Sequence, residues 1–295
     1  MLGEFSVRTD LALEARESFE EGDVRIRGVQ IEEAADEERE IYTTVVRIET
    51  ENGAKAMGKP VGTYVTLEAP NMSAEDEDYH REISCALSQH LLELLGDKEQ
   101  TVLVVGLGNR EVTPDALGPE VVGNLKITRH IAKEYGKASL EGAKKLVSAI
   151  VPGVMAQTGM ETLEIIKGVV RETKPHAVIV IDALAARSTR RLNRTIQITD
   201  TGINPGSGVG NHRNGINSEV LGVPVIAVGV PTVVDAATIV NDSVEQAAET
   251  KERSQMIREM ISPQLNTMFV TPKDIDETIK RISFTISEGL NMALS

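Results

Sequence analysis

The chain has 295 residues, long enough to bury a substantial core in one large α/β domain or in two smaller ones. Its formal net charge of −14 at pH 7 gives an acidic surface that repels phosphate backbones, so binding to nucleic acid is not expected. A single cysteine, Cys85, excludes an internal disulfide and cysteine-rich zinc sites. The sequence shows no signal-peptide core and no membrane-spanning apolar run, which predicts a soluble, cytoplasmic protein without a membrane partner.

The first predicted elements are two strands over 41–50 and 61–70. The segment between them is glycine-rich, so the pair is expected to form a hairpin at a sheet edge. Residues 75–96 have the spacing of an amphipathic helix that Gly96 ends.

Three apolar runs are typical of buried parallel strands, because they are continuous and rich in β-branched residues: 101–106, 176–182 and 223–229. A helix is predicted over 159–173, before the second run, and another over 232–249, after the third. Strands that alternate with helices predict an α/β fold with a mostly parallel (mixed) central sheet and helices on both faces.

Two further segments complete the pattern. Residues 202–219 are too rich in glycine and asparagine for regular structure and are predicted to form a loop. Residues 272–294 are predicted to form a long C-terminal helix.

The first apolar run ends in Gly106-Leu107-Gly108-Asn109, the kind of turn that opens a phosphate-binding loop. A Walker loop would end in Lys-Ser or Lys-Thr, which is absent here, and a dinucleotide fingerprint would have a glycine where Glu111 stands. Nucleotide binding is therefore not expected. An isolated Gly-x-Gly is more often a tight turn that needs glycine dihedral angles.

Two aspartates stand near the ends of predicted strands. Asp115 follows the run 101–106, and Asp182 ends the run 176–182. Ligands of an open parallel sheet gather beyond the carboxyl ends of its strands, so both carboxylates are expected to face one crevice. Paired carboxylates can share a proton and act as acid and base, or they can bind a divalent metal. Alternatively, Asp115 caps a helix and Asp182 pairs with an arginine.

Arg187, Arg190 and Arg191 form a basic cluster that could bind an acidic substrate, or could lie on a solvated face or at a subunit contact. His212, in the glycine-rich loop, is a weak candidate for a metal ligand or a proton shuttle. Neither a Gly-x-Ser-x-Gly elbow nor a His-Glu-x-x-His motif occurs, so nothing supports serine-hydrolase or zincin chemistry. The residues alone indicate an α/β enzyme with a carboxylate-based site.

Five segments resemble the germination protease family of spore-forming bacteria: 7-VRTDLALEARE-17, 102-VLVVGLGNREVTPDALGP-119, 149-AIVPGVMAQTGMET-162, 177–213 and 219-EVLGVPVIAVGVPTVVDA-236. The resemblance extends from Val7 to about Val240 and includes several long, unbroken motifs. It implies an endopeptidase that begins to degrade small acid-soluble spore proteins when a spore germinates. Such an enzyme cuts after an acidic residue and acts in the cytoplasm of the spore core.

The same resemblance implies an inactive zymogen that removes its own prosegment, residues 1–10, by a cut between Asp10 and Leu11. A single α/β peptidase domain, 11–295, then remains, with the hairpin-like part at about 41–70. The family resemblance further implies a homotetramer without a cofactor. The two essential aspartates of this aspartic-type family match Asp115 and Asp182.

A more distant similarity is to hydrogenase maturation endopeptidases, which share a strand followed by Gly-x-Gly-Asn and an acid. This similarity implies a phosphorylase/hydrolase-like fold, and it makes a metal-dependent peptidase with a divalent ion the alternative. The histidine that those enzymes use as a third ligand has no matched position, and His212 is the candidate.

The preferred mechanism uses two carboxylates. One takes a proton from the attacking water, and the other, protonated, donates a hydrogen bond to the developing oxyanion. The backbone at Gly106 and Gly108 is expected to approach the substrate chain. Arg187, Arg190 or Arg191 is expected to bind the acid that precedes the cut.

Overall fold

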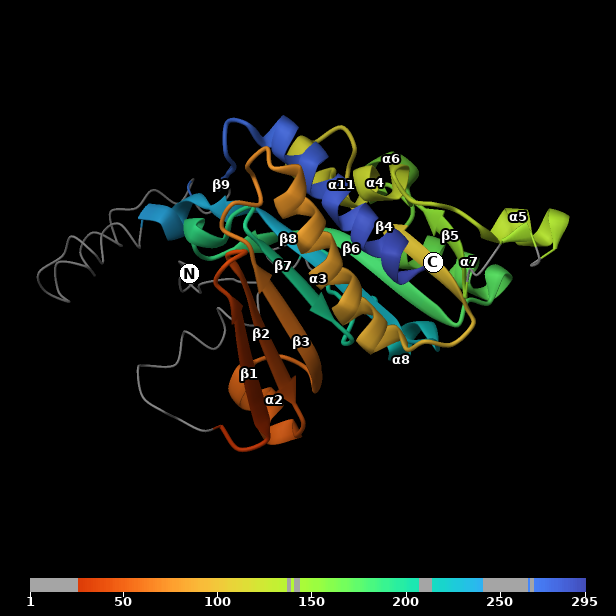
Figure 1. The fold of residues 1–295 in the computed structure, drawn as a ribbon, viewed down its shortest axis with the longest axis horizontal. Helices are drawn as coiled ribbons and strands as arrows, with labels where there is room; N and C mark the ends of the chain where they lie inside the picture. Colours follow the sequence, from red (N-terminus) through yellow and green to blue (C-terminus); the bar gives the residue numbers. More distant parts are fainter. Residues whose placement is uncertain (1–25, 137–138, 141–143, 207–213, 241–264, 266–267) are drawn as a thin grey trace, which may run out of the picture.

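The computed structural model describes residues 26–136, 139–140, 144–206, 214–240, 265 and 268–295. Within these ranges nine strands form one mixed sheet in the order β1-β2-β3-β7-β8-β6-β4-β5, and β9 pairs with β8 (Figure 1). The strands are β1 (Val29–Asp36), β2 (Ile41–Ile48), β3 (Gly62–Glu68), β4 (Gln100–Gly106), β5 (Lys145–Ile150), β6 (Ala177–Ala186), β7 (Thr195–Thr199), β8 (Val225–Asp235) and β9 (Phe269–Val270).

The helices surround this sheet. They are α2 (Glu51–Met57), α3 (Glu77–Leu95), α4 (Leu117–Gly123), α5 (Arg129–Tyr135), α6 (Met155–Thr158), α7 (Thr162–Thr173), α8 (Ser218–Leu221) and α11 (Ile275–Ala293), with 3₁₀ turns η1 (Thr113–Asp115) and η3 (Thr189–Arg191). In the part of the chain that the structure describes, no helix combines the length and the apolar character needed to span a membrane.

The strands β5, β4, β6 and β8 are parallel and form one half of the sheet. Along β6, Ile179 and Ile181 pack in the core with α3, α4 and α11, whereas Val178 and Val180 pack in a second core with α7. Helices therefore cover both faces of this half. Burial on both faces explains why its strands are continuous apolar runs, and the predicted α/β class is confirmed.

The strands β7, β3, β2 and β1 pair antiparallel and form the other half. The two strands predicted over 41–50 and 61–70 are present as β2 and β3. A short helix, α2, lies between them: the Thr50 hydroxyl accepts a hydrogen bond from the Gly53 N–H at its start, and Gly58 ends it at φ 62°. The antiparallel half is thus larger and more structured than the sequence predicted.

The long helices predicted over 75–96 and 272–294 are confirmed as α3 and α11. Asp76 caps α3, because its Oδ1 accepts the N–H of Tyr79 at 3.0 Å, and Gly96 ends the helix. The two helices pack closely where Gly289 of α11 lies against α3: a Cβ at Gly289 would come within 2.8 Å of the Leu87 side chain. This pair covers one face of the parallel half (Figure 1).

The helix predicted over 159–173 is α7, which begins at Thr162 behind a capping box of Glu161 and Glu164. The start predicted for the next helix, at Thr232, is wrong. Residues 232–235 continue β8, because they pair with β6 and β9, and the helix begins at Ala236 with the Asp235 carboxylate accepting the Thr238 N–H at 3.0 Å. Residues 241–249 of that prediction lie outside the described ranges.

Candidate active site

The connections that leave β4 and β6 run to opposite sides within the sheet. After β4, the chain continues through α4, which packs with α3 and α11 through Leu117 and Val121, and reaches β5 on one side of β4. After β6, it continues through η3 to β7, which lies beyond β8 on the other side. Strands β4 and β6 are neighbours, so their carboxyl ends form the topological switch point where open α/β sheets bind ligands.

The turn after β4 depends on two glycines. A Cβ at Gly106 would lie 2.3 Å from the carbonyl oxygen of Gly118, so the missing side chain lets α4 approach the strand. Gly108 has φ 110°, and a Cβ there would lie 1.9 Å from the Asp115 carbonyl oxygen. Both glycines therefore have a packing role, and their predicted approach to a substrate chain stays a prediction.

Asp115 ends the 3₁₀ turn η1 and closes the loop that precedes it. The Asn109 N–H donates to the Asp115 carboxylate Oδ2 at 2.8 Å and to the Asp115 carbonyl oxygen at 3.0 Å. The residue is half-buried. Helix α4 begins two residues later with Ala116 as its N-cap, and the Asp115 carboxylate bonds back to the loop at Asn109.

Asp182 lies on β6 and is 6% exposed. The prediction that it ends its strand is wrong, because β6 continues to Ala186 by pairing with β8. The neighbouring strand β4, however, stops at Gly106 opposite Ile181, and the Leu107 N–H then donates to the Ile181 carbonyl at 2.8 Å. Asp182 is therefore the first residue of β6 beyond the end of β4. Its Oδ1 accepts the N–H of Ala183 at 3.0 Å.

Hydrogen bonds from β8 fix η1 beside these strands. The Thr232 hydroxyl, on a side chain that is 1% exposed, donates to the Pro114 carbonyl at 2.7 Å, and the Thr271 hydroxyl donates to the Thr232 carbonyl at 2.8 Å. The turn η1 also contacts β6 and α11. The structure thus positions Asp115 and Asp182 on elements that pack together at the carboxyl end of β4.

The short helix α6, which follows β5, joins the same edge. The Gln157 amide donates to Asn109 Oδ1 at 3.3 Å, and that oxygen also accepts the Glu111 N–H at 3.0 Å. From the sequence alone, Asn109, Gln157 and Thr232 had no predicted role at the site. An asparagine that follows Gly-x-Gly is a turn signal that could have indicated the first of them.

The three arginines of the predicted basic cluster have different surroundings. Arg191 is 8% exposed, and its Nη1 lies 3.7 Å from Glu68 Oε1 on β3, so a carboxylate of the chain already faces it. Arg187 is half-buried and Arg190 is exposed. Of the three, Arg190 retains the exposure that binding to a substrate carboxylate from solvent would need.

In the described ranges no three side chains of histidine, cysteine, aspartate or glutamate lie close enough to form a metal site. The divalent ion considered from the sequence stays a prediction. His212 lies outside these ranges, as do Asp10 and Leu11 of the predicted self-cleavage site.

Comparison with known proteins identifies the family. The family model described as "Germination protease" matches residues 7–249. The chain belongs to the germination protease family. The matched range contains both aspartates and every strand of the parallel half, so the family match includes the whole switch point.

Individual relatives agree with this family membership. The germination protease of Caldanaerobacter subterraneus subsp. tengcongensis is 49% identical over 98% of this chain and 94% of the relative. That of Clostridium tetani is 45% identical over 98% of this chain and 95% of the relative, and that of Bacillus mycoides is 38% identical over 99% and 95%. A protease role in spore germination follows from the family.

Proposed function

We propose that the chain is an aspartic-type endopeptidase that begins the degradation of small acid-soluble spore proteins during germination, in the cytoplasm of the spore core. Family membership supports the protease role. The observation that carries the proposed chemistry is the position of Asp115 and Asp182 at the switch point between β4 and β6.

In the proposed reaction one of the two carboxylates is ionised and takes a proton from the water that attacks the scissile carbonyl. The other is protonated and donates a hydrogen bond to the oxygen on which negative charge develops. The proton taken from water then passes to the leaving amine. Because a coupled pair titrates as a unit, the two roles belong to the pair rather than to one named residue.

The hydrogen bonds at the two carboxylates support this assignment. The Asn109 N–H orients Asp115, and the Ala183 N–H orients Asp182. Backbone donors do not move when the reaction occurs, so each carboxylate keeps a fixed orientation. A pair of flexible surface acids would lack this preorganisation.

Regulation and assembly are part of the same proposal. The chain is made as a zymogen that cuts itself between Asp10 and Leu11, and it assembles as a homotetramer. The acid before that bond has the same chemistry as the substrate residue after which the enzyme cuts. We propose neither a membrane partner nor a nucleic-acid partner for the enzyme.

The test is cleavage of a small acid-soluble spore protein, followed by intact mass, with wild type, Asp115→Asn and Asp182→Asn. Each variant keeps the size of the side chain but loses the ionisable group, so cleavage is expected to slow about 10³-fold or more. Asp97→Asn is the matched control, because Asp97 is exposed and pairs with Lys144 on the surface.

The outcomes separate the mechanisms. Loss of cleavage in both site variants, with normal circular dichroism, supports the aspartate pair. Cleavage at the wild-type rate by both variants would contradict it. Activity that a chelator abolishes in the wild type would instead support the metal-dependent alternative.

A further inference from the structure

The turn after β4 holds a side-chain amide beside Asp115. Asn109 is half-buried, and its backbone N–H donates to the Asp115 carboxylate Oδ2 at 2.8 Å. The mechanism proposed above uses this backbone group to orient the carboxylate. It assigns no role to the Asn109 side chain.

A backbone donor fixes which way the Asn109 amide faces. The Glu111 N–H donates to Asn109 Oδ1 at 3.0 Å, and the Gln157 amide of α6 donates to the same oxygen at 3.3 Å. A backbone N–H can only donate, so the atom that faces it must be the amide oxygen and not the amide nitrogen. The two N–H groups of Asn109 Nδ2 are therefore directed away from Glu111.

These side-chain donors stay available, whereas backbone donors around them are in use. The Leu107 N–H donates to the Ile181 carbonyl at 2.8 Å. The Val112 N–H donates to the Asn109 carbonyl at 3.0 Å. Among the hydrogen bonds of the described residues, none starts from Asn109 Nδ2. The turn thus keeps a neutral donor that a ligand can use.

Asn109 Nδ2 can reach a substrate carbonyl that is attacked from Asp115. The covalent path from the Asn109 backbone nitrogen to Nδ2 spans at most about 5 Å. That backbone nitrogen is itself in hydrogen-bond contact with Asp115 Oδ2. A water bound to the carboxylate lies about 3 Å from it, and the carbonyl that the water attacks lies about 3 Å further. The carbonyl oxygen is then within the range of the amide.

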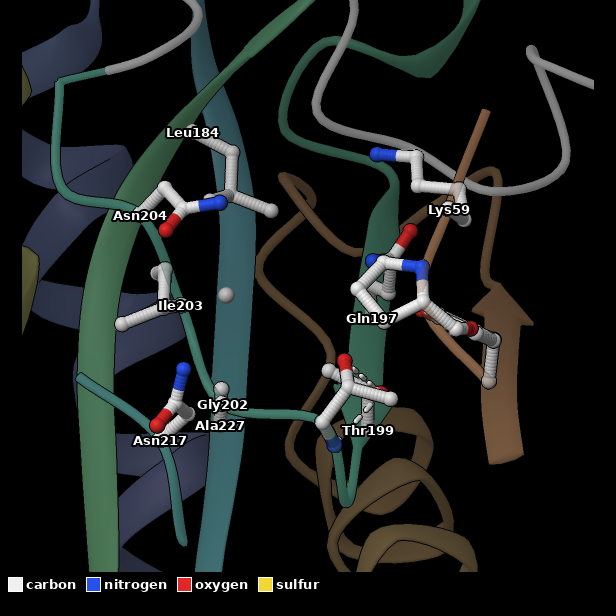
Figure 2. A pocket seen from close by; sticks show the side chains of 13 residues that line it. Lys59, Leu184, Gln197, Thr199, Gly202, Ile203, Asn204, Asn217 and Ala227 are labelled. Atoms are coloured by element: carbon white, nitrogen blue, oxygen red, sulfur yellow. Dashed lines mark hydrogen bonds between the residues drawn. The ribbon is translucent and has the colours of Figure 1, made fainter. Parts of the chain in front are cut away.

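A second group of amides lies in a polar cavity of about 120 Å³ on the sheet face that carries Asp182 (Figure 2). They are Gln197, Asn204 and Asn217. In the sheet register Asp182 pairs with Gly229 of β8, and Gly229 pairs with Gln197 of β7. Neighbouring strands lie about 4.8 Å apart, so Gln197 is about 10 Å from Asp182. Asn109, by contrast, contacts Asp115 directly.

We infer that the Asn109 side chain is a catalytic donor: its Nδ2 donates a hydrogen bond to the scissile carbonyl oxygen as negative charge develops there. This inference rests on the proposed peptidase function, and it adds a neutral donor to the protonated carboxylate of the pair. The amide keeps its protons, so the proton transfers of the reaction do not change. A fixed donor stabilises the developing oxyanion more than the neutral carbonyl, so it raises kcat rather than substrate affinity.

The test measures kcat and KM for cleavage of a small acid-soluble spore protein by the full-length chain. Intact mass checks that all variants are in the same processed state, and tagged wild type, later removed, completes processing where a variant is slow. Asn109→Asp keeps an oxygen for Glu111 and Gln157 but has no N–H. It is expected to lower kcat about 10²- to 10³-fold and to change KM less than about 3-fold. Asn109→Ala loses the donor without adding charge and is expected to lower kcat by a similar factor.

Asn124→Asp and Asn124→Ala are the matched controls. Asn124 is exposed after α4, and its Nδ2 donates to the Glu120 carbonyl at 3.0 Å. The same exchanges are thus made outside the site, and kcat is expected to stay at the wild-type value.

Binding of a tetrahedral anion separates a donor from a merely structural residue. The probe is a peptide with a phosphinate in place of the scissile amide. Asn109→Ala is expected to weaken inhibition by this peptide by about the factor by which it lowers kcat. Equilibrium binding of the ordinary amide peptide, compared between Asp182→Asn and the double variant with Asn109→Ala, is expected to be equal.

Three results would overturn the inference: kcat near the wild-type value in Asn109→Ala, a rise in KM at unchanged kcat, or unchanged phosphinate inhibition while kcat falls. Each of these leaves the aspartate pair standing if Asp115→Asn and Asp182→Asn are inactive. Cleavage at the wild-type rate by both aspartate variants would instead contradict the pair, and the role of Asn109 with it.

Discussion

Strand β6 of the parallel half and strand β7 of the antiparallel half are both buried, but their buried surfaces differ in chemistry. Nine of the ten residues of β6 (Ala177–Ala186) are apolar, and Asp182 is the exception. All five residues of β7 (Thr195–Thr199) are buried too, yet three of them are polar. The parallel half thus gives a rigid apolar frame for two carboxylates, whereas the antiparallel half turns a polar face toward the neighbouring cavity.

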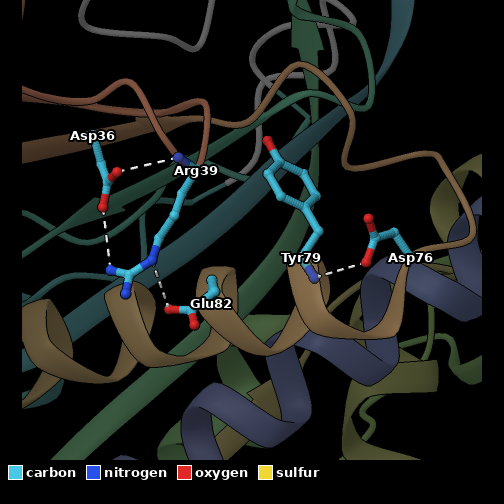
Figure 3. Close-up of polar contacts among 5 residues, drawn as sticks. All are labelled: Asp36, Arg39, Asp76, Tyr79 and Glu82. Atoms are coloured by element: carbon cyan, nitrogen blue, oxygen red, sulfur yellow. Dashed lines mark hydrogen bonds and ion pairs between the residues drawn. The ribbon is translucent and has the colours of Figure 1, made fainter.

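The contact between the antiparallel half and helix α3 differs from the buried cores, because exposed polar groups form it. The turn between β1 and β2 reaches α3 through Arg39, whose guanidinium lies 3.1 Å from Asp36 and 3.4 Å from Glu82 (Figure 3). These side chains are exposed, and exposed ion pairs contribute about 0–1 kcal/mol. Nearby, the Tyr79 hydroxyl donates to the Glu40 carbonyl at 3.0 Å.

The parallel and antiparallel halves of the sheet therefore contribute differently to the proposed peptidase. The switch point needs exact positions, which tight packing on both faces of the parallel half provides. The antiparallel half instead brings polar side chains to the cavity that Tyr64 of β3 and Gln197 and Thr199 of β7 help to line. Substitutions of the same type in the two halves should therefore have different consequences.

The largest expected contrast is between two glycines of positive φ. Gly108→Ala places a methyl group 1.9 Å from the Asp115 carbonyl oxygen at φ 110°, so it should destabilise the protein by about 3 kcal/mol. It should also lower kcat/KM about 100-fold by displacing Asp115. Gly58→Ala, at φ 62° with open space around the new methyl, should cost about 1 kcal/mol and leave activity intact.

Urea denaturation and cleavage assays on the two variants check this pair. Equal activity losses would show that the turn at Gly108 does not set the position of Asp115. Equal stability losses would show that open space at Gly58 does not reduce the cost of a side chain there.

The next prediction concerns how the free energy of unfolding depends on pH, through a tyrosine of the antiparallel half. Burial raises the pKa of Tyr64 to about 12, and the nearby charge of Asp200 adds to the rise while a hydrogen bond with Thr201 opposes it. Between pH 10 and 12 the unfolded chain has lost the phenol proton while the folded chain keeps it. The free energy of unfolding should therefore fall by about 1.4 kcal/mol per pH unit in this window, from a contribution that is fully present below pH 10.

Tyr64→Phe isolates this contribution. Denaturation of wild type and variant at several alkaline pH values should show a steeper decline for wild type. In an ultraviolet titration the variant should lack the tyrosinate signal that develops near pH 12. Parallel declines would mean that the Tyr64 phenol ionises as easily in the folded as in the unfolded chain.

The elements that the sequence predicted correctly are those whose local pattern and final burial agree. Strands β4, β6 and β8 are apolar on both faces, and α3 and α11 have one apolar stripe each, so periodicity alone indicates them. The sequence predicts Asp115 and Asp182 as site residues because each carboxylate lies near the end of an apolar run, and their catalytic role stays a prediction.

What the sequence did not predict depends on contacts between distant segments. The acidic and alanine-rich β1 has low intrinsic strand propensity, and its pairing with β2 makes it a strand. The extension of β6 beyond Asp182 follows from pairing with β8 across a register shift at Leu184. The cavity combines residues from Lys59 to Gly229, and no local pattern relates them.

The smallest expected effect compares two hydroxyls. Thr232→Val removes the hydrogen bond to the Pro114 carbonyl in the parallel half, and Thr50→Val removes the helix cap of α2 in the antiparallel half. Each should lower the free energy of unfolding by about 1 kcal/mol. Only Thr232→Val should also lower kcat/KM, about 10-fold, because a slight shift of η1 moves Asp115 relative to Asp182.

Because Thr232→Val and Thr50→Val are expected to lose the same stability, a difference between their activities reports on the position of Asp115. If both variants keep full activity, the packing of η1 against β6 and α11 positions Asp115 without help from the hydroxyl. If both lose activity equally, general destabilisation explains the loss. The hydrogen bond from Thr232 then does not determine the geometry of the site. A loss confined to Thr232→Val would show that one hydrogen bond from β8 determines where the first of the two carboxylates stands.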